Sequence, residues 1–364
     1  MKLLIDLSIL RHPYCGLGQI ALNYGRWLAG HAHEIPSGID ITLLVPKPYI
    51  GAFGPYVGYL QARPIYRHLP WLLPRFDLWH SIHQLSPFRP ANRRTRRIVT
   101  IHDLNFLYEK HGRKRLRYLH RLQAECDRAD TLCFISQFAR QQALQHLRLG
   151  TTPLHTIYNG VQDLTTGPQR PPLGIDPARP FLLSIGVIKP KKNIHTLFPL
   201  MTLLPGYDLI VAGNDTDPYA RDLRSQLPSH PNIRFTGIVD DDQRRWLYAH
   251  CTALLMPSLS EGFGLPVIEA MQWGKPVFAS THTSLPEIGG THAFYFTDFQ
   301  PAHMAGTLLQ GLAAYTPAKA QDAKTHAATF NYDTHMTRYC NLYQTIAQAA
   351  ADCRSAKTKK IRKK

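Results

Sequence analysis

Short apolar strands that alternate with helices most constrain the fold of this 364-residue chain. Each strand is bounded by polar or turn residues, and helical stretches such as 113–128 and 137–147 lie between some of them. The first group of strands is predicted at residues 2–7, 41–45, 78–81, 98–101, 131–135 and 154–157. Strands that alternate with helices imply a parallel, doubly wound sheet.

A proline-rich stretch at residues 166–180 interrupts this alternation. The alternation then restarts, with strands predicted at 181–185, 208–212, 233–235, 253–256 and 276–279. We therefore predict an α/β fold with two Rossmann-like domains, at 1–165 and 181–335, joined by a linker at 166–180. Apolar residues at helical spacing predict a final helix at 336–352, and the basic tail at 354–364 is expected to be disordered.

The composition is that of a folded protein, with 44% hydrophobic and 18% charged residues. No apolar run is long enough for a spanning helix, and Asp6 interrupts the apolar start of the chain, which argues against a signal peptide. The cysteines are scattered without a CxxC pair, so we interpret them as reduced thiols of a cytoplasmic protein. They are Cys15, Cys126, Cys133, Cys251, Cys340 and Cys353.

The net charge of +17 predicts an anionic partner. The basic residues gather at 93–97, 110–121 and 357–364. Nucleic acid, an anionic membrane surface and a phosphorylated substrate would all be attracted to such a surface. Charge alone does not choose among them.

The most informative segment is 258–271, where a predicted strand is followed by a glycine turn and a helix. Gly262 and Gly264, with Phe263 and Leu265 in the same turn, would bring backbone N–H groups and a helix N-terminus close to a diphosphate. Glu269 is placed to bind a ribose diol. Glu261 is placed to reach hydroxyls of a sugar.

The sequence of this segment, Glu-Gly-Phe-Gly-Leu-Pro-x-x-Glu-Ala-Met, resembles the motif of the retaining family-4 glycosyltransferases, which have the GT-B fold of two Rossmann-like domains. The resemblance extends along nearly the whole chain. It includes Gly16-x-Gly18, Thr100-Ile101-His102-Asp103, Tyr158-Asn159-Gly160, Gly186 with Lys191-Lys192-Asn193, and Ser284-Leu285-Pro286-Glu287.

The resemblance implies roles for individual residues. Lys192 matches the lysine that pairs with the donor diphosphate, and His102 matches the histidine that reaches across the cleft to the transferred sugar. Val187 follows Gly186 where many members have an arginine, so Lys189 or Lys191 is expected to substitute. The expected catalytic residues are thus His102, Glu261 and Lys192.

Further residues complete the predicted site. The donor is expected to contact Gly18, Gly186, Lys189, Lys191, Gly262, Phe263, Gly264, Leu265 and Glu269. The candidates on the acceptor side are Gly16, His80, His83 and Asp103. The resemblance also places Glu287 near the nucleotide and predicts that the final helix returns to the first domain.

Two acidic clusters, Asp215-Thr216-Asp217 and Asp240-Asp241-Asp242, are interpreted as turns and helix caps. We expect no metal site and no cofactor apart from the nucleotide-sugar donor.

The predicted function is transfer of a sugar from a nucleotide diphosphate to a glycan or lipid-linked acceptor, with retention as the resemblance implies. A phosphorylase or sugar-phosphate synthase on the same fold is the alternative within enzymes. A basic nucleic-acid-binding protein is the alternative outside them, although no motif for it is present.

The sequence also predicts a contact with a membrane. Arg113, Arg117 and Arg121 recur at helical spacing, and the apolar residues of 56–76 are mixed with arginines, so we expect peripheral binding at the inner face of the cell membrane.

Overall fold

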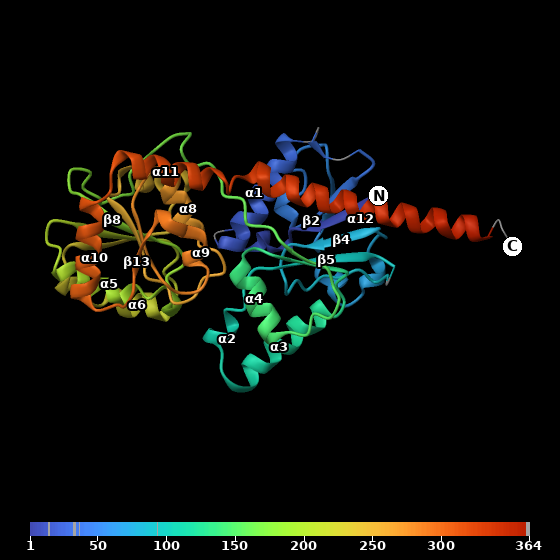
Figure 1. Cartoon of the computed structure of the whole chain (residues 1–364), viewed down its shortest axis with the longest axis horizontal. Helices are drawn as coiled ribbons and strands as arrows, with labels where there is room; N and C mark the ends of the chain where they lie inside the picture. Colours follow the sequence, from blue (N-terminus) through green and yellow to red (C-terminus); the bar gives the residue numbers. More distant parts are fainter. Residues whose placement is uncertain (14, 32–33, 36, 93, 362–364) are drawn as a thin grey trace.

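The computed structural model describes residues 1–13, 15–31, 34–35, 37–92 and 94–361, and for residues 350–361 only the backbone. Two sheets, each built of parallel strands and flanked by helices, lie side by side along the long axis of the molecule (Figure 1). This is the two-domain GT-B architecture. The strands are mostly apolar runs because both faces of each sheet are covered.

The first domain contains a seven-stranded sheet in the order β3-β2-β1-β4-β5-β6-β7. All its neighbouring strands pair in parallel, and β1 lies between β2 and β4, where the strand order reverses. The strands are β1 (Lys2–Asp6), β2 (Asp40–Val45), β3 (Gly58–Gln61), β4 (Leu78–Ser81), β5 (Arg96–Ile101), β6 (Thr131–Phe134) and β7 (Leu154–Thr156).

The second domain repeats this plan with a six-stranded sheet in the order β10-β9-β8-β11-β12-β13. Its order reverses between β8 and β11, and open α/β sheets bind ligands beyond the carboxyl ends of the strands at such a point. The strands are β8 (Phe181–Ile185), β9 (Asp208–Ala212), β10 (Ile233–Gly237), β11 (Ala253–Met256), β12 (Val277–Ser280) and β13 (Phe294–Phe296).

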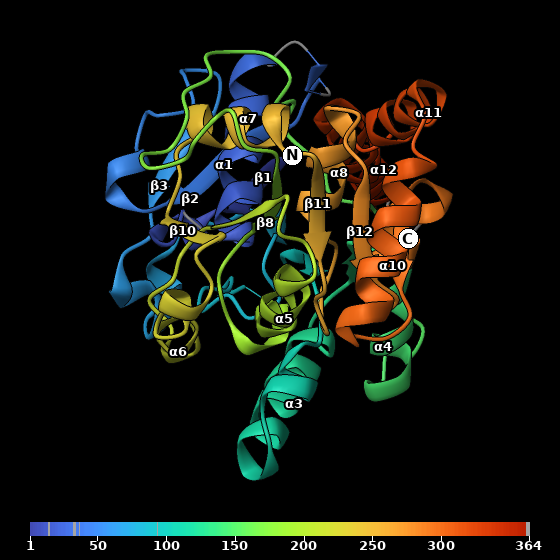
Figure 2. The same ribbon diagram turned by 90° about the vertical axis from the view of Figure 1, so that its left-hand side faces the viewer.

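Helices cover the faces of both sheets (Figure 2). Those of the first domain are α1 (Gly16–Gly30), α2 (Phe106–Glu109), α3 (Gly112–Cys126) and α4 (Gln137–His146). Those of the second are α5 (Leu197–Thr202), α6 (Pro218–Arg224), α7 (Asp241–His250), α8 (Leu265–Gln272), α9 (Leu285–Gly289), α10 (Pro301–Ala313) and α11 (Pro317–Ala328). Short 3-10 turns include η1 (Ser8–Arg11), η4 (Pro64–Arg67), η5 (Pro70–Leu72) and η6 (Pro190–Lys192).

The last helix, α12 (Tyr332–Ile361), leaves the second domain and runs over the first (Figure 1). Met336, Tyr339 and Tyr343 are buried in the same core as strands β1, β2 and β4. A buried chain of hydrogen bonds fixes the helix there. His80 Nδ1 lies 2.6 Å from the Tyr343 hydroxyl, which is 2.5 Å from that of Tyr24. Asn331, directly before α12, also pairs with Val161, shortly before the linker. The two segments that connect the domains therefore lie side by side here.

Several predicted strands have the observed bounds, among them 78–81, 181–185, 208–212 and 253–256. The prediction missed β3 and β13, which are edge strands of three or four residues without a long apolar run. In the structure the backbone of α12 continues to Ile361, through most of the tail for which disorder was expected. Alanine, lysine and arginine favour helices, and extending a formed helix avoids the cost of nucleation. Residues 362–364 lie outside the described residues.

Candidate donor and acceptor cleft

A cleft of about 960 Å³ lies between the two domains. Its first-domain wall is formed by residues at the start of α1 and by the turn after β5, with His102 and Asp103. Its second-domain wall is formed by the loops that follow β8, β9, β10 and β11, together with the starts of α7 and α8. The cleft is therefore located where each doubly wound sheet is expected to bind a ligand.

Neighbouring side chains hold the loop between β11 and α8 in place. The Glu261 amide donates to Thr283 Oγ1 over 2.9 Å, and the Ser284 hydroxyl is 3.1 Å from the Glu261 carbonyl and 3.0 Å from that of Phe263. Thr283 has a φ of 57°, which is costly for a β-branched residue. Its contact with Glu261 links this unusual backbone to the site.

Gly264 ends the same loop, and the backbone conformation at this position requires a glycine. Its φ is 104°, and an added Cβ would lie 2.8 Å from Leu285 Cδ2. This turn directs the N-terminus of α8 into the cleft, where Gly264, Leu265 and Pro266 line the wall. The helix then stops before Gly274, which has a φ of 65°.

Gly262 lets the two domains approach each other closely. A Cβ at this position would lie 2.5 Å from the His102 carbonyl oxygen and 2.9 Å from Asp103 Cβ. The sequence predicted that Gly262 admits a ligand, but its closest neighbours in the structure belong to the first domain. The Ser136 hydroxyl also donates to the Gly262 carbonyl over 2.9 Å, so α4 and this loop are tied together.

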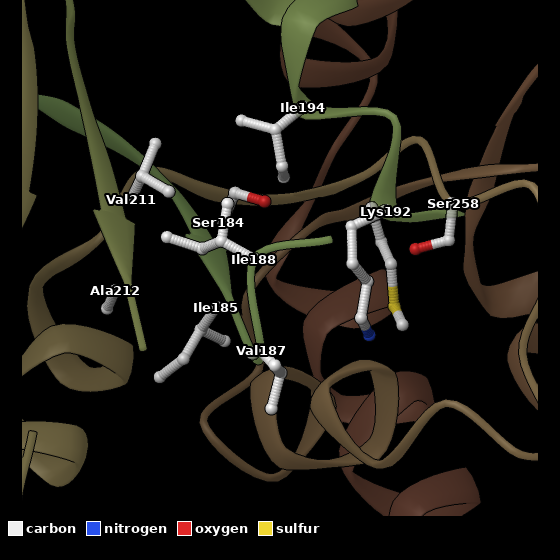
Figure 3. A pocket seen from close by; sticks show the side chains of 11 residues that line it. Ser184, Ile185, Val187, Ile188, Lys192, Ile194, Val211, Ala212 and Ser258 are labelled. Carbon is white, nitrogen blue, oxygen red and sulfur yellow. The ribbon is translucent and has the colours of Figure 1, made fainter. Parts of the chain in front are cut away.

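Lys192 comes from the turn after β8 and lies between Val187 and Ser258 (Figure 3). Asn193 follows with a φ of 57°, a conformation that asparagine tolerates better than most residues. Lys192 Nζ lies 2.6 Å from Glu261 Oε1, and the two side chains are only 15% and 12% exposed. Gly186 leaves room beside this ammonium group, because its Cβ position is 3.4 Å from Lys192 Nζ.

Glu269 lies one turn into α8 and is held by two residues of α7. Its Oε2 accepts a hydrogen bond from the Tyr248 hydroxyl over 2.6 Å, and its Oε1 lies 3.9 Å from Arg244 Nη1. Tyr248 is buried, and its pKa is raised by burial and by the Glu269 charge. Arg244 lines the cleft with Glu269. Neither partner was predicted from the sequence, because the pattern of this segment indicated only a capped helix.

His102 faces Gly262 from the first domain, and its ring is oriented by the backbone. Its Nε2 lies 2.6 Å from the Ile82 carbonyl oxygen, which only accepts, so Nε2 carries the proton. Burial lowers its pKa to about 3, although the hydrogen bond to Ile82 opposes the change. The imidazole is therefore neutral at physiological pH, and Nδ1 is an acceptor.

The structure divides the remaining acceptor-side candidates. Gly16 and Asp103 line the cleft. His80 is fully buried between Tyr343 and Thr100, so it holds α12 and does not face the cleft. His83 and Gly18 are not among the lining residues; a Cβ on Gly18 would lie 2.1 Å from the His12 carbonyl oxygen, so this glycine packs α1 against the preceding loop.

Most of the predicted donor residues do meet in this cleft. The lining residues include Gly186, Lys189, Lys191, Lys192, Glu261, Gly262, Phe263, Gly264, Leu265 and Glu269. Glu287 instead reaches the first domain, where its carboxylate accepts from the Gln137 and Phe138 amides over 2.6 and 2.9 Å. It thereby caps α4 across the domain boundary.

The acidic clusters have the predicted structural roles. Asp217 caps α6, and Asp240 forms a capping box with Gln243 at the start of α7. In the described part of the chain, no group of three or more His, Cys, Asp or Glu side chains is arranged to hold a metal ion. Asp240, Asp241 and Asp242 nevertheless line the cleft, which the sequence analysis did not anticipate.

Comparison with known proteins gives two family matches. Residues 24–163 match the family described as Glycosyltransferase Family 4, and residues 166–319 match Glycosyl transferases group 1. The O-antigen chain mannosyltransferase B of Escherichia coli is 26% identical over 390 residues, which cover 95% of this chain and 100% of that relative.

Solved structures share the fold over almost the full length. The sucrose-phosphate synthase of Thermosynechococcus elongatus matches with a TM-score of 0.74 and 18% identity, covering 96% of this chain and 100% of that one. The Anabaena protein HepE, solved in complex with UDP-glucose, matches with a TM-score of 0.71 and 19% identity, covering 97% and 100%.

Proposed function

This chain belongs to the family-4 glycosyltransferases and transfers a sugar, and we propose that its donor is a nucleotide diphosphate sugar bound on the second-domain wall of the cleft. The observation that carries this proposal is the convergence of Lys192, Glu261, Glu269 and the α8 N-terminus on one wall. The diphosphate meets Lys192 and the helix N-terminus, and the ribose meets Glu269. The sugar lies between Glu261 and His102.

The proposed reaction proceeds with retention. The bond between the anomeric carbon and the β-phosphate oxygen breaks, and the acceptor oxygen bonds to that carbon on the same face. The acceptor proton passes to the departing phosphate oxygen. Lys192 and the α8 N-terminus stabilise the charge that develops there. Neutral His102 accepts a hydrogen bond from a sugar hydroxyl at Nδ1 and transfers no proton in this scheme, since its pKa of about 3 keeps the imidazole neutral.

The donor and the stereochemistry are tested together. A thermal-shift panel of UDP-, GDP- and ADP-sugars identifies the donor, because a specific ligand stabilises the native state according to its concentration relative to Kd. Mannose is the first sugar to test, since the full-length relative is named a mannosyltransferase. NMR of the product then shows its anomeric configuration. An inverted anomer, or stabilisation by none of the donors, contradicts the proposal.

Two further assays separate the alternatives. We expect full activity in EDTA, because the proposed stabilisation of the leaving group uses Lys192 and backbone N–H groups. Release of sugar phosphate that depends on orthophosphate would instead favour a phosphorylase. Turnover of a nucleotide sugar onto a glycan hydroxyl excludes a protein that only binds nucleic acid.

The acceptor is proposed to be a glycan held at an anionic membrane, and α3 is the surface that supports this. The helix projects from the first domain in both views (Figures 1 and 2). Leu122 is buried in the core, whereas Leu116 is 55% exposed among basic residues. The exposed cations of α3 are Arg113, Lys114, Arg115, Arg117 and Arg121. Each cation near an anionic surface contributes about 1 kcal/mol.

Co-sedimentation with vesicles tests this surface. The protein should bind anionic vesicles at low salt, bind neutral ones weakly, and lose binding in Arg113→Gln/Arg117→Gln/Arg121→Gln. The control is Lys319→Gln/Lys324→Gln, which removes two exposed charges from α11 of the second domain. A chain that ends at Ala356 measures what the basic tail adds. Equal, negligible binding to both vesicle types refutes the membrane contact. No helix within the described ranges is both long and apolar enough to cross a membrane.

A further inference from the structure

An ion pair joins the two domains at the edge of the proposed diphosphate site. Lys191 Nζ of the second domain lies 2.9 Å from Glu109 Oε1 at the end of α2 in the first domain. The lysine side chain is 26% exposed and the glutamate 36%. Lys192, the next residue, is paired within its own domain to Glu261. Neighbouring lysines therefore have counter-ions on opposite domains.

Lys191 lies in a surplus of carboxylates. Burial lowers its pKa, but Asp103, Glu109 and Glu261 together outweigh burial and raise it. Burial likewise raises the pKa of Glu109, yet its pKa is lowered because Lys191 is close and Lys110 and Lys189 add to the effect. Both members of the pair are thus charged at neutral pH. Lys191 thus gains from Glu109 the negative charge that a bound anion would otherwise supply.

The backbone and side chain of Lys191 are held differently. Its carbonyl accepts from the Leu259 amide over 2.8 Å, which ties the backbone to the loop that also carries Glu261. The ammonium is held by a partly exposed ion pair, and such pairs are weak. A lysine stem is long and flexible, so the ammonium is free to change partner while the backbone stays fixed. Lys191 and Lys192 line the same cleft.

We propose that Glu109 competes with the donor diphosphate for Lys191, so that donor entry releases this ion pair between the domains. The inference rests on the proposed donor site. Val187 offers no cation in this wall, and Lys189 is exposed, which leaves Lys191 as the second partly buried ammonium beside Lys192. A diphosphate carries more negative charge than the single carboxylate of Glu109. The Lys191 ammonium therefore leaves Glu109 and pairs with the diphosphate.

This proposal predicts a gain of affinity on removing an acidic residue. Isothermal titration of the full-length protein with UDP, GDP and ADP identifies the diphosphate that binds. Glu109→Gln should bind it about two- to fivefold more tightly at low ionic strength, with the gain reduced in high salt. Lys191→Met should bind it more weakly. Asp322→Asn, which removes the same charge from an exposed position on α11, should match the wild type.

The double variant separates competition for Lys191 from simple repulsion of the ligand. If Glu109 acts by holding Lys191, Glu109→Gln has no effect on diphosphate affinity in the Lys191→Met background. A gain that persists in that background, or weaker binding by Glu109→Gln, overturns the inference. If the wild type binds a diphosphate and Glu109→Gln binds it with the same affinity, the inference is overturned but the proposed donor site is not. Failure of all three diphosphates to bind overturns the proposed donor site as well.

Discussion

Lys192 Nζ lies 2.6 Å from Glu261 Oε1, so the cation proposed for the donor phosphate and the carboxylate proposed for the donor sugar neutralise each other. This contact allows two buried charges of opposite sign to coexist in a cleft wall that is only partly open to water. Donor binding must therefore share Lys192 between Glu261 and the phosphate.

Lys192→Met should weaken donor binding and slow turnover. Loss of a charged partner typically costs about 1.5 to 3 kcal/mol, or roughly 10- to 100-fold. The variant also leaves Glu261 without its cation, so Lys192→Met/Glu261→Gln should recover part of the stability but not the activity. Titration calorimetry, kcat/KM and thermal unfolding measure the three effects. Lys47→Met, on an exposed turn, is the control; equal losses in both variants would contradict the assignment.

Glu269→Gln should lower nucleotide affinity by a similar factor, because a carboxylate accepts both hydroxyl protons of a ribose and an amide accepts fewer. Tyr248→Phe removes only the 2.6 Å bond that orients Glu269 and should have a smaller effect. Titration with the identified nucleoside diphosphate compares the three proteins. Unchanged affinity and turnover in Glu269→Gln would refute its place at the ribose.

Gly262→Ala should impair activity through the domain contact. The new Cβ would lie 2.5 Å from the His102 carbonyl oxygen, which is backbone and cannot rotate away. The loop between β11 and α8 must then retreat from the first domain, which misplaces Glu261 relative to His102. Gly306→Ala in α10 adds a Cβ that meets no atom within 4 Å and should keep full kcat/KM. Equal activity of the two variants would show that the close approach is dispensable.

The sequence predicted the part of the second-domain wall between β11 and α8 because the residues of that part are close together in the chain. A strand, a glycine turn and a helix place Glu261, Gly264 and Glu269 within one short segment, and chain connectivity alone keeps them together. The pairing of Lys192 with Glu261 joins two loops that follow adjacent strands, β8 and β11. Parallel strands end at the same edge, so this contact was also within reach of sequence reasoning.

The contacts between domains could not be predicted in the same way. Glu109 and Lys191 are separated by α3, α4, the strands β6 to β8 and the linker, and nothing in either segment specifies the other. His80 was misplaced for a related reason. A histidine in a strand beside a predicted cleft suggests a site, but its partner Tyr343 lies 263 residues away on α12. Only the three-dimensional packing reveals that this ring is structural.

Glu287→Gln should loosen the contact of the second domain with α4. Its carboxylate accepts from the Gln137 and Phe138 amides at the positive end of that helix. Glutamine keeps one acceptor oxygen and loses the charge, so the contact should weaken by about 1 to 2 kcal/mol. Hydrogen exchange of residues 137–140 should accelerate, while exchange in β1 and β8 stays unchanged. Protection of α4 equal to that of the wild type would contradict the prediction.

Acid should destabilise the protein through its buried histidines, and His80 provides the test. Burial lowers the pKa of His80 to about 3 and that of His335 to about 4, whereas an unfolded histidine titrates near 6.5. Below about pH 6.5 the unfolded chain binds protons that the folded chain excludes, so stability falls as the pH decreases toward these folded values. Between pH 7 and pH 5 the loss is about 2 kcal/mol for each such histidine. Urea unfolding at the two pH values measures this loss of stability.

The variant His80→Gln should be less stable than the wild type at pH 7, because the hydrogen bonds of His80 to Tyr343 and Thr100 are disturbed. On acidification, however, the variant should lose about 2 kcal/mol less than the wild type. An identical loss in both proteins would show that His80 keeps an ordinary pKa in the folded state.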